Sequence, residues 1–190
     1  MEIKHKIKHI IKNKIKNNTS NNISLIGFMG SGKSSTGRIL AERLGYIFID
    51  IDEVITIQQG IEIQLIFEKY GEKYFRMAET DVIKKIYTNF SCVFACGGGV
   101  VLKKINMDII KKNSTVIYLK VSPEVAYERL KESTGRPLLS TGKDMRETIK
   151  EIISKRENLY SGYADIIIDT DNQAPELVAA EILSSLKSRG

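Results

Sequence analysis

The segment GFMGSGKS, residues 27–34, restricts the possible folds of this chain more than any other feature. It fits G-x-x-x-x-G-K-[ST], a loop whose backbone N–H groups surround phosphate oxygens. An apolar run at residues 23–26 precedes the loop, and Ile39, Leu40 and Leu44 follow it at helical spacing. A strand, a phosphate loop and a helix in this order predict an α/β fold that binds a nucleoside triphosphate with Mg²⁺ at a helix N-terminus.

Two side chains of this loop carry chemistry of their own. Lys33 is expected to reach the outer phosphates, and the Ser34 hydroxyl to ligate Mg²⁺. Many classes of protein use such a loop, but the length argues against motors and helicases, and no N-K-x-D guanine signature of a GTPase occurs. The rest of the chain must therefore define the phosphoryl acceptor. The ATP-binding residues expected here are Gly30, Ser31, Gly32, Lys33, Ser34 and Ser35.

The positive charge of the chain is concentrated in its first residues. With 190 residues, 42% of them hydrophobic, the chain is long enough for one domain with a sizeable core. Residues 1–22 hold six lysines and one glutamate, which accounts for +5 of the net charge of +6. Residues 23–190 are almost neutral, so we expect no nucleic-acid-binding surface on the domain. No apolar run approaches the ~20 residues that a membrane span needs.

Residues 1–22, MEIKHKIKHIIKNKIKNNTSNN, form a low-complexity Ile/Lys/Asn segment. We expect a flexible N-terminal extension without catalytic purpose, ending in the linker NNTSNN before a single domain at residues 23–190. The alternative is a basic amphipathic helix on an anionic surface, because five isoleucines fall at helical spacing. The segment lacks the continuous apolar core of a signal peptide and the arginines of a transit peptide.

Both cysteines, Cys92 and Cys96, precede a run of glycines. If both lie on one strand, four residues separate them by roughly 13 Å, at about 3.3 Å per residue. A disulfide tolerates a Cα separation of only about 7 Å, and no histidine lies nearby for a zinc site. We therefore expect reduced, buried cysteines, which suit a cytosolic protein.

A second apolar strand ends in two aspartates, Asp50 and Asp52, within YIFIDIDEVI, residues 46–55. If the chain stays extended, both carboxylates point to the same side. At the carboxyl edge of a parallel sheet, one could hold a magnesium-bound water and the other accept a hydroxyl proton, which suits phosphoryl transfer to an alcohol. Asp52 could also cap the helix that follows.

Two arginines on separate predicted helices are candidates for an anion site. Arg76 and Glu79, in GEKYFRMAETDVIKKIY (residues 71–87), are three residues apart and can pair on one helix face. An ordinary surface ion pair would explain them equally well. Arg156 lies on a later helix, four residues before Tyr160. Two guanidinium groups that converge on one cleft would form a forked site for a carboxylate or phosphate.

Three glycines, Gly97, Gly98 and Gly99, stand in a row in ACGGGVVL, residues 95–102. Glycine costs conformational entropy and leaves the backbone bare, so three together need a reason. The position after an apolar strand indicates that another group lies against this backbone.

These motifs together resemble the shikimate kinase family, from residue 23 to about residue 186. The segments that carry the resemblance are GFMGSGKSS, DID, FRMAE, CGGG, GRPLL, KRENLY and DTDNQAP, in family order and at family-like spacing. The resemblance implies a three-layer α/β fold with a five-stranded parallel sheet, a helical substrate-binding segment at about residues 52–88 and a lid at about residues 131–144. It implies transfer of the ATP γ-phosphoryl group to the 3-hydroxyl of shikimate, towards chorismate and aromatic amino acids.

The resemblance also implies roles for the acidic and basic residues, position by position. Asp50 resembles the aspartate near the magnesium, and Asp52 the one that binds shikimate hydroxyls and is a candidate base. Arg76 and Arg156 match the pair that grips the shikimate carboxylate, with Glu79 orienting Arg76.

Further roles concern the backbone, the lid and the adenine pocket. Gly98 matches the backbone donor to a substrate hydroxyl, so the acceptor ring is expected against Gly97, Gly98 and Gly99, where a side chain at Gly98 would occupy its space. Arg136, in the polar lid segment, is expected to swing over the transferring phosphoryl group and stabilise its charge. Arg129 resembles the residue that stacks on adenine, and Pro175 resembles the other wall of that pocket.

Two departures from the family pattern are the extension at residues 1–22 and Ser35, where threonine is frequent. A gluconate-type or nucleoside monophosphate kinase is a rival on the same core, although no base-reading pocket is evident for a nucleotide acceptor. A catalytically silent ATP-binding module, or an adaptor tethered to membranes by its basic extension, is the rival of another class. We expect a cytoplasmic monomer that binds ATP and shikimate, without stable membrane binding.

Overall fold

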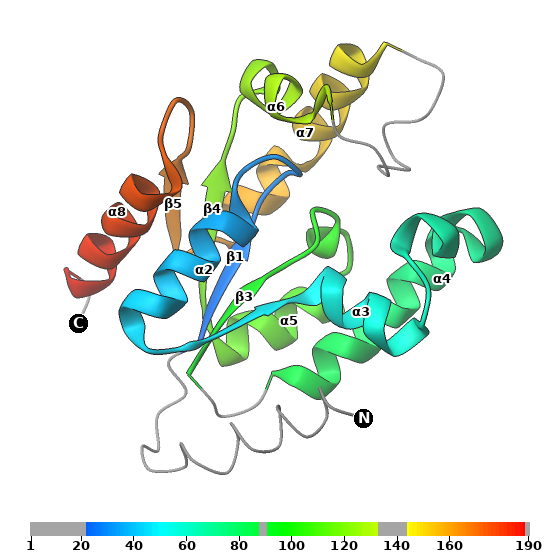
Figure 1. The fold of residues 1–190 in the computed structure, drawn as a ribbon, viewed down its shortest axis with the longest axis horizontal. Helices are drawn as coiled ribbons and strands as arrows, with labels where there is room; N and C mark the ends of the chain where they lie inside the picture. Colours follow the sequence, from blue (N-terminus) through cyan, green and yellow to red (C-terminus); the bar gives the residue numbers. More distant parts are fainter. Residues whose placement is uncertain (1–21, 88–90, 133–143, 189–190) are drawn as a thin grey trace.

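The computed structural model describes residues 22–87, 91–132 and 144–188. Within these residues, five strands form one sheet in which every neighbouring pair is parallel (Figure 1). In order across the sheet, the strands are β2 (Ile47–Asp50), β3 (Cys92–Ala95), β1 (Ile23–Ile26), β4 (Thr115–Lys120) and β5 (Ile166–Asp169). The predicted five-stranded parallel sheet is confirmed.

Helices cover both faces of this sheet and make the fold three-layered (Figure 1). One face packs against α2 (Lys33–Leu44) and α8 (Pro175–Lys187). The other face packs against α4 (Ile63–Ile86), α5 (Lys104–Asn113) and the C-terminal part of α7 (Met145–Tyr163). The remaining elements are α3 (Ile51–Gln59), α6 (Pro123–Leu130) and the short 3₁₀ helix η1 (Val100–Leu102).

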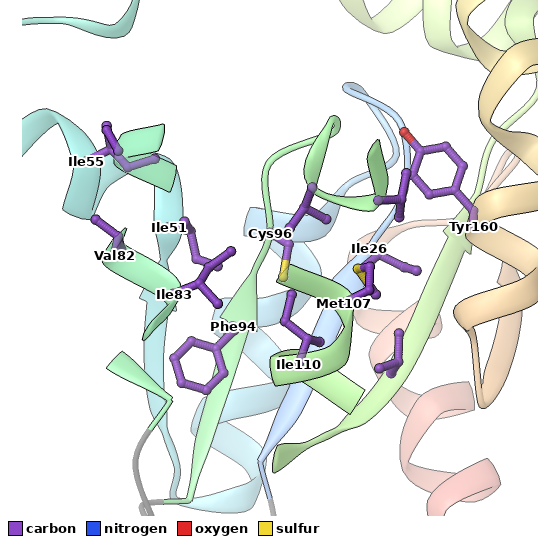
Figure 2. Packing of buried hydrophobic residues seen from close by; sticks show 14 of the residues in the cluster. Ile26, Ile51, Ile55, Val82, Ile83, Phe94, Cys96, Met107, Ile110 and Tyr160 are labelled. Carbon is purple, nitrogen blue, oxygen red and sulfur yellow. The ribbon is translucent and has the colours of Figure 1, made fainter. Parts of the chain in front are cut away.

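The central strands β1 and β3 are buried along their whole length because successive side chains enter two different cores. Leu25 and Val93 point into the core shared with α2 and α8. Their neighbours Ile26 and Phe94 point into the core shared with α4 and α5, where Ile83 of α4 is completely buried (Figure 2). A sheet covered on both faces cannot show the alternation of apolar and polar residues that a half-exposed sheet shows.

The crossing of the chain opens a crevice at the carboxyl edge of the sheet. Strand β1 leads into α2 on one face, whereas its neighbour β3 leads through η1 into α5 on the other face. The loops that follow these two strands therefore diverge, and such a switch point is where open α/β sheets bind ligands. The phosphate loop follows β1, and the three glycines follow β3, so the two motifs face each other across this crevice.

The structure corrects two predicted boundaries. Helix α2 begins at Lys33, whereas the sequence predicts the helix only after the loop segment that ends at residue 34. Asn22, predicted to be linker, is buried: its Nδ2 donates to the carbonyl of Asn113 at 3.1 Å, and its Oδ1 accepts from the backbone N of Cys92 at 3.0 Å. The domain therefore includes residue 22, because this amide ties β1 to β3 and to the end of α5.

Helix α4 is longer than the predicted helix and is interrupted within its first half. It begins at Ile63, and Gly71, with φ 77° and ψ 171°, breaks its helical geometry. Both cysteines are buried and reduced, as predicted, with Cys92 opening β3 and Cys96 following it. No helix in the described part of the chain is both long and apolar enough to cross a membrane. The extension at residues 1–21 and most of the predicted lid, residues 133–143, lie outside the described residues.

Candidate active site

The loop between β1 and α2 forms a cradle of backbone groups. Gly27, Gly30 and Gly32 have φ angles of 142°, 80° and 86°, in the region that favours glycine. Gly32 directly precedes α2, and the first turn of that helix carries no acidic side chain. The first N–H groups of α2 and the positive end of its dipole therefore point toward the loop. This is the arrangement that binds phosphate.

Lys33, the first residue of α2, turns its side chain back into this loop. Its Nζ donates to the carbonyl oxygens of Gly27 at 2.9 Å and Phe28 at 2.8 Å, and to Ser31 Oγ at 3.4 Å. The ammonium group thus lies among the loop's own backbone groups. From this location the ammonium group lies within the loop that is expected to bind phosphates.

Ser34 and Asp50 meet at the carboxyl edge of the sheet. The hydroxyl of Ser34 donates to Asp50 Oδ2 at 2.7 Å, although the two residues come from different βα units. Both line a cavity of about 240 Å³, together with Lys33, Asp52 and the loop around Gly98. The serine, the lysine and the two aspartates therefore share one site, as the motif spacing predicts.

The structure corrects the predicted geometry of the two aspartates. Strand β2 ends at Asp50 and α3 begins at Ile51, so the chain does not stay extended as far as Asp52. Asp50, and not Asp52, caps the helix: its Oδ1 accepts from the backbone N of Asp52 at 3.0 Å. Both carboxylates still reach the cavity, because Asp52 lies in the first turn of α3.

The donor set around Ser34 fits Mg²⁺. A hydroxyl and a carboxylate, 2.7 Å apart beside a phosphate-binding loop, are the hard oxygen ligands that this ion prefers. Among the described residues, no three His, Cys, Asp or Glu side chains gather into a metal site. Mg²⁺ commonly takes only one or two protein oxygens and completes its shell with phosphates and water, so one such pair suffices.

The glycine run lets three side chains approach its backbone. A Cβ on Gly99 would lie 2.0 Å from Arg76 Nη2. A Cβ on Gly97 would lie 2.9 Å from Asp52 Oδ1 and 3.0 Å from Glu79 Oε1. The glycines at these two positions therefore bring one guanidinium and two carboxylates together over the backbone. At Gly98 a Cβ would meet the backbone of the phosphate loop at 3.4 Å, an ordinary contact.

Arg76 and Glu79 form a buried pair on α4. Arg76 Nη1 donates to both carboxylate oxygens of Glu79 at 3.0 Å. Glu79 also accepts from Asn106 Nδ2 at 3.4 Å, and Lys103 Nζ donates to the carbonyl of Arg76 at 3.1 Å. The pair is not the surface ion pair that the sequence left open, since both side chains are buried.

Burial raises the pKa of Glu79 from its ordinary value of 4.5 to about 7. The Arg76 guanidinium and its hydrogen bonds act in the lowering direction, and the nearby charge of Asp52 raises the pKa further. Burial is the dominant cause, because removing a carboxylate from water disfavours its charged form.

Arg156 approaches the same glycine run from α7. Its Nη1 donates to the carbonyl of Gly98 at 3.1 Å, and the hydroxyl of Tyr160 donates to the same carbonyl. Tyr160 is fully buried and stacks on Tyr118 of β4, which fixes its ring. Arg76 and Arg156, 80 positions apart in the chain, therefore converge on consecutive glycines.

A second cavity, of about 270 Å³, lies on the other side of the phosphate loop. Gly30 and Gly32 line it together with Arg129 and Pro175, the two residues expected at the adenine pocket. Arg129 Nη1 donates to the carbonyl of Gly30 at 3.0 Å, and Nη2 donates to the carbonyl of Thr170 at 2.6 Å. Arg129 thus bridges the phosphate loop and the turn before α8.

The predicted site residues that the structure describes fall into these two cavities and the glycine run between α4 and α7. Arg136 lies outside the described residues. Three residues of the site were not predicted from the sequence. Tyr160 was named only to locate Arg156, and Glu72 and Lys103 both contact Arg76. The spacing of four residues between Glu72 and Arg76 could have indicated their pairing. No local signal pointed to Lys103.

A parallel sheet with a phosphate loop, a hydroxyl–carboxylate pair beside it and two arginines across the crevice defines the class of the phosphate-loop kinases. Within that class, the shikimate kinase family model matches residues 29–187, and the chain belongs to this family.

Similar proteins agree with this assignment. The chain is 48% identical to the shikimate kinase of Thermodesulfovibrio yellowstonii over 161 residues, 85% of this chain and 92% of that one. A solved shikimate kinase from Acinetobacter baumannii, in complex with shikimate, superposes with a TM-score of 0.87 at 35% identity and covers 90% of this chain and 96% of its own. The shikimate kinase of Aquifex aeolicus gives a TM-score of 0.77 at 38% identity, over 88% of this chain and 97% of its own.

Proposed function

We propose that this chain transfers the γ-phosphoryl group of ATP to the 3-hydroxyl of shikimate, giving shikimate 3-phosphate and ADP on the route to chorismate and the aromatic amino acids. The observation that carries the proposal is the convergence of Arg76, Arg156 and Asp52 on the three glycines. Two guanidinium groups suit a carboxylate, and an aspartate suits a hydroxyl, so the site matches a small acid that also carries hydroxyl groups. Membership of the shikimate kinase family supports shikimate as that acid.

The acceptor is held by side chains from three segments. Arg76 and Arg156 bind its carboxylate, and Glu79 keeps Arg76 in place. Asp52 accepts a hydrogen bond from the 3-hydroxyl and takes its proton as the bond to phosphorus forms. The rate enhancement comes mainly from alignment of the hydroxyl with the γ-phosphorus.

The donor is held by the phosphate loop. The N–H groups of the loop, from Gly30 to Ser35, and the ammonium group of Lys33 bind the phosphates and offset the charge that develops during transfer. Ser34 and Asp50 would hold Mg²⁺, which would neutralise phosphate charge during transfer. Arg136, which lies outside the described residues, is expected to add a further positive charge at the transferring group.

The nucleoside occupies the second cavity, with its adenine between Arg129 and Pro175. This cavity and the cavity beside Asp52 share the phosphate-loop residues Gly30, Gly32 and Ser35, which suits a direct transfer between two bound substrates. The protein acts as a cytoplasmic monomer, without nucleic-acid or stable membrane partners. The near-neutral charge of residues 23–190 supports this part of the proposal.

The test is ADP release from Mg-ATP, with shikimate, gluconate and a panel of nucleoside monophosphates offered separately. Release that depends on shikimate alone is the expected result. Release with gluconate or a nucleoside monophosphate alone would contradict the proposal. ATP binding without any acceptor-dependent release would indicate the silent ATP-binding module instead.

A further inference from the structure

Two carboxylates hold the guanidinium of Arg76, and only one of them is buried. Nη1 donates to Glu79, whereas Nε and Nη2 both donate to Oε1 of Glu72 at 3.2 Å. The side chains of Arg76 and Glu79 are 9% and 0% exposed, but that of Glu72 is 46% exposed. Breaking the buried pair would leave an uncompensated charge in the interior, whereas water can replace a half-exposed partner. Glu79 is therefore a permanent partner of Arg76, and Glu72 is an exchangeable one.

Glu72 covers the edge of Arg76 that a ligand carboxylate needs. The N–H groups of Nε and Nη2 are parallel and match the two oxygens of a carboxylate. Nη1 is committed to Glu79, and the backbone of Gly99 lies against the guanidinium, so neither offers an equivalent edge. A carboxylate that binds Arg76 in a fork must take the place that Glu72 occupies.

The backbone allows Glu72 to leave this place without disturbing the core. Gly71, directly before it, interrupts the helical geometry of α4, and nothing lies within 4 Å of the position that a Cβ would take there. Glu72 itself is exposed. Its departure from Arg76 therefore costs one half-exposed ion pair.

We propose that Glu72 is a built-in competitor of the acceptor, a carboxylate that occupies the binding edge of Arg76 until the acceptor's carboxylate displaces it. This inference rests on the proposed function, in which Arg76 binds the acceptor. A simple acid gains little binding free energy when it displaces Glu72, because one ion pair with Arg76 replaces another. An acceptor that also contacts Arg156 and Asp52 gains those contacts, so Glu72 favours hydroxylated acids over simple ones.

The test compares Glu72→Gln with the matched control Glu68→Gln. Glu68 lies on the same helix, is exposed and accepts a hydrogen bond from Gln64 Nε2 at 2.9 Å, so its substitution changes the charge equally without touching Arg76. Glu72→Gln should lower the KM and the Kd for shikimate roughly two- to fivefold, the range expected for one exposed ion pair. The kcat and the KM for ATP should not change, and Glu68→Gln should match the wild type. Glu72→Asp, which keeps the charge but shortens the reach, should also lower the KM for shikimate.

Several outcomes would overturn the inference. An unchanged or higher KM for shikimate in Glu72→Gln would mean that Glu72 does not compete, or that it orients Arg76 for the acceptor. Equal effects of Glu72→Gln and Glu68→Gln would mean that only the overall charge matters. If the wild-type protein is active with shikimate, each of these results refutes the role of Glu72 alone. If the wild type shows no shikimate-dependent ADP release, the proposed function fails, and the role of Glu72 fails with it.

Discussion

The guanidinium of Arg76 lies directly against the backbone of Gly99, at a place where a Cβ would be 2.0 Å from Nη2 and 2.4 Å from Cζ. No side chain fits in this space, so the glycine is a condition for the position of the arginine. Glu79 holds the guanidinium of Arg76, and Lys103 Nζ donates to the Arg76 carbonyl. The protein's own side chains therefore require glycines in this run. The acceptor that is expected to lie over the run is a second reason.

Substitution Gly99→Ala should displace Arg76 and weaken acceptor binding. We expect the KM for shikimate to rise roughly 10- to 100-fold, the size expected for losing hydrogen bonds to a charged group. The KM for ATP should stay unchanged, because the phosphate loop is not touched. Gly162→Ala is the matched control, since a Cβ there meets nothing within 4 Å. An unchanged KM for shikimate in Gly99→Ala would contradict the role of Arg76.

Substitution Asp52→Asn should remove the proton acceptor and leave nucleotide binding intact. We expect kcat to fall by about 10²- to 10⁴-fold, the usual contribution of a positioned general base. The Kd for ATP, measured by calorimetry, should stay close to that of the wild type. Glu53→Gln, at the next position and paired with Arg38 at the surface, should keep full activity. Full turnover in Asp52→Asn would exclude the role assigned to this residue.

Glu79 should make the stability of the fold depend on pH. Its pKa of about 7 in the folded protein exceeds its ordinary value of 4.5, so the folded state keeps a proton that the unfolded state releases between these values. Stability from this group is therefore complete below pH 4.5 and is lost as the pH rises through 7, by at most about 1.4 kcal/mol per pH unit.

Urea unfolding of the wild type and of Glu79→Gln between pH 4.5 and 8 measures this effect. The free energy of unfolding of the wild type, minus that of the variant, should decrease as the pH rises and level off above about pH 7. A difference that stays flat, or that increases with pH, would show that the Arg76 ion pair dominates over burial.

The two cysteines should be inert in the folded protein. Burial raises the pKa of the Cys96 thiol to about 12, so almost no thiolate is present at pH 8, and Cys92 is equally buried. Iodoacetamide should leave the native protein unmodified and add two carbamidomethyl groups after unfolding in guanidinium, as read by intact mass. Rapid modification of the native protein would contradict this burial.

Much of the site could be predicted from local spacing. The phosphate loop needs only eight consecutive residues and the apolar run before them; its strand forms where the pattern places it, and its helix begins earlier, at Lys33. The pairing of Arg76 with Glu79 follows from their separation of three residues. The family resemblance then joined motifs that spacing alone could not connect, such as Arg76 and Arg156.

Other features depend on contacts that no short window contains. The chain turns from strand to helix directly after Asp50, and this single bend decides that Asp50 caps α3 while Asp52 faces the glycines. Asn22 looks like linker because its neighbours are polar, yet it is buried against β3 and α5. A polar residue can be placed in the interior only when its hydrogen-bond partners are known.

The sequence by itself determined the phosphate loop, the apolar strands and the set of residues available for catalysis, because these depend on residue type and on periods of two or 3.6 residues. Only the tertiary structure decided that Gly97 and Gly99 are the glycines in close contact and that Tyr160 shares the Gly98 carbonyl with Arg156. The physical reason is that steric fit and the sharing of hydrogen-bond partners arise between segments that are distant in sequence and meet only when the sheet and helices pack.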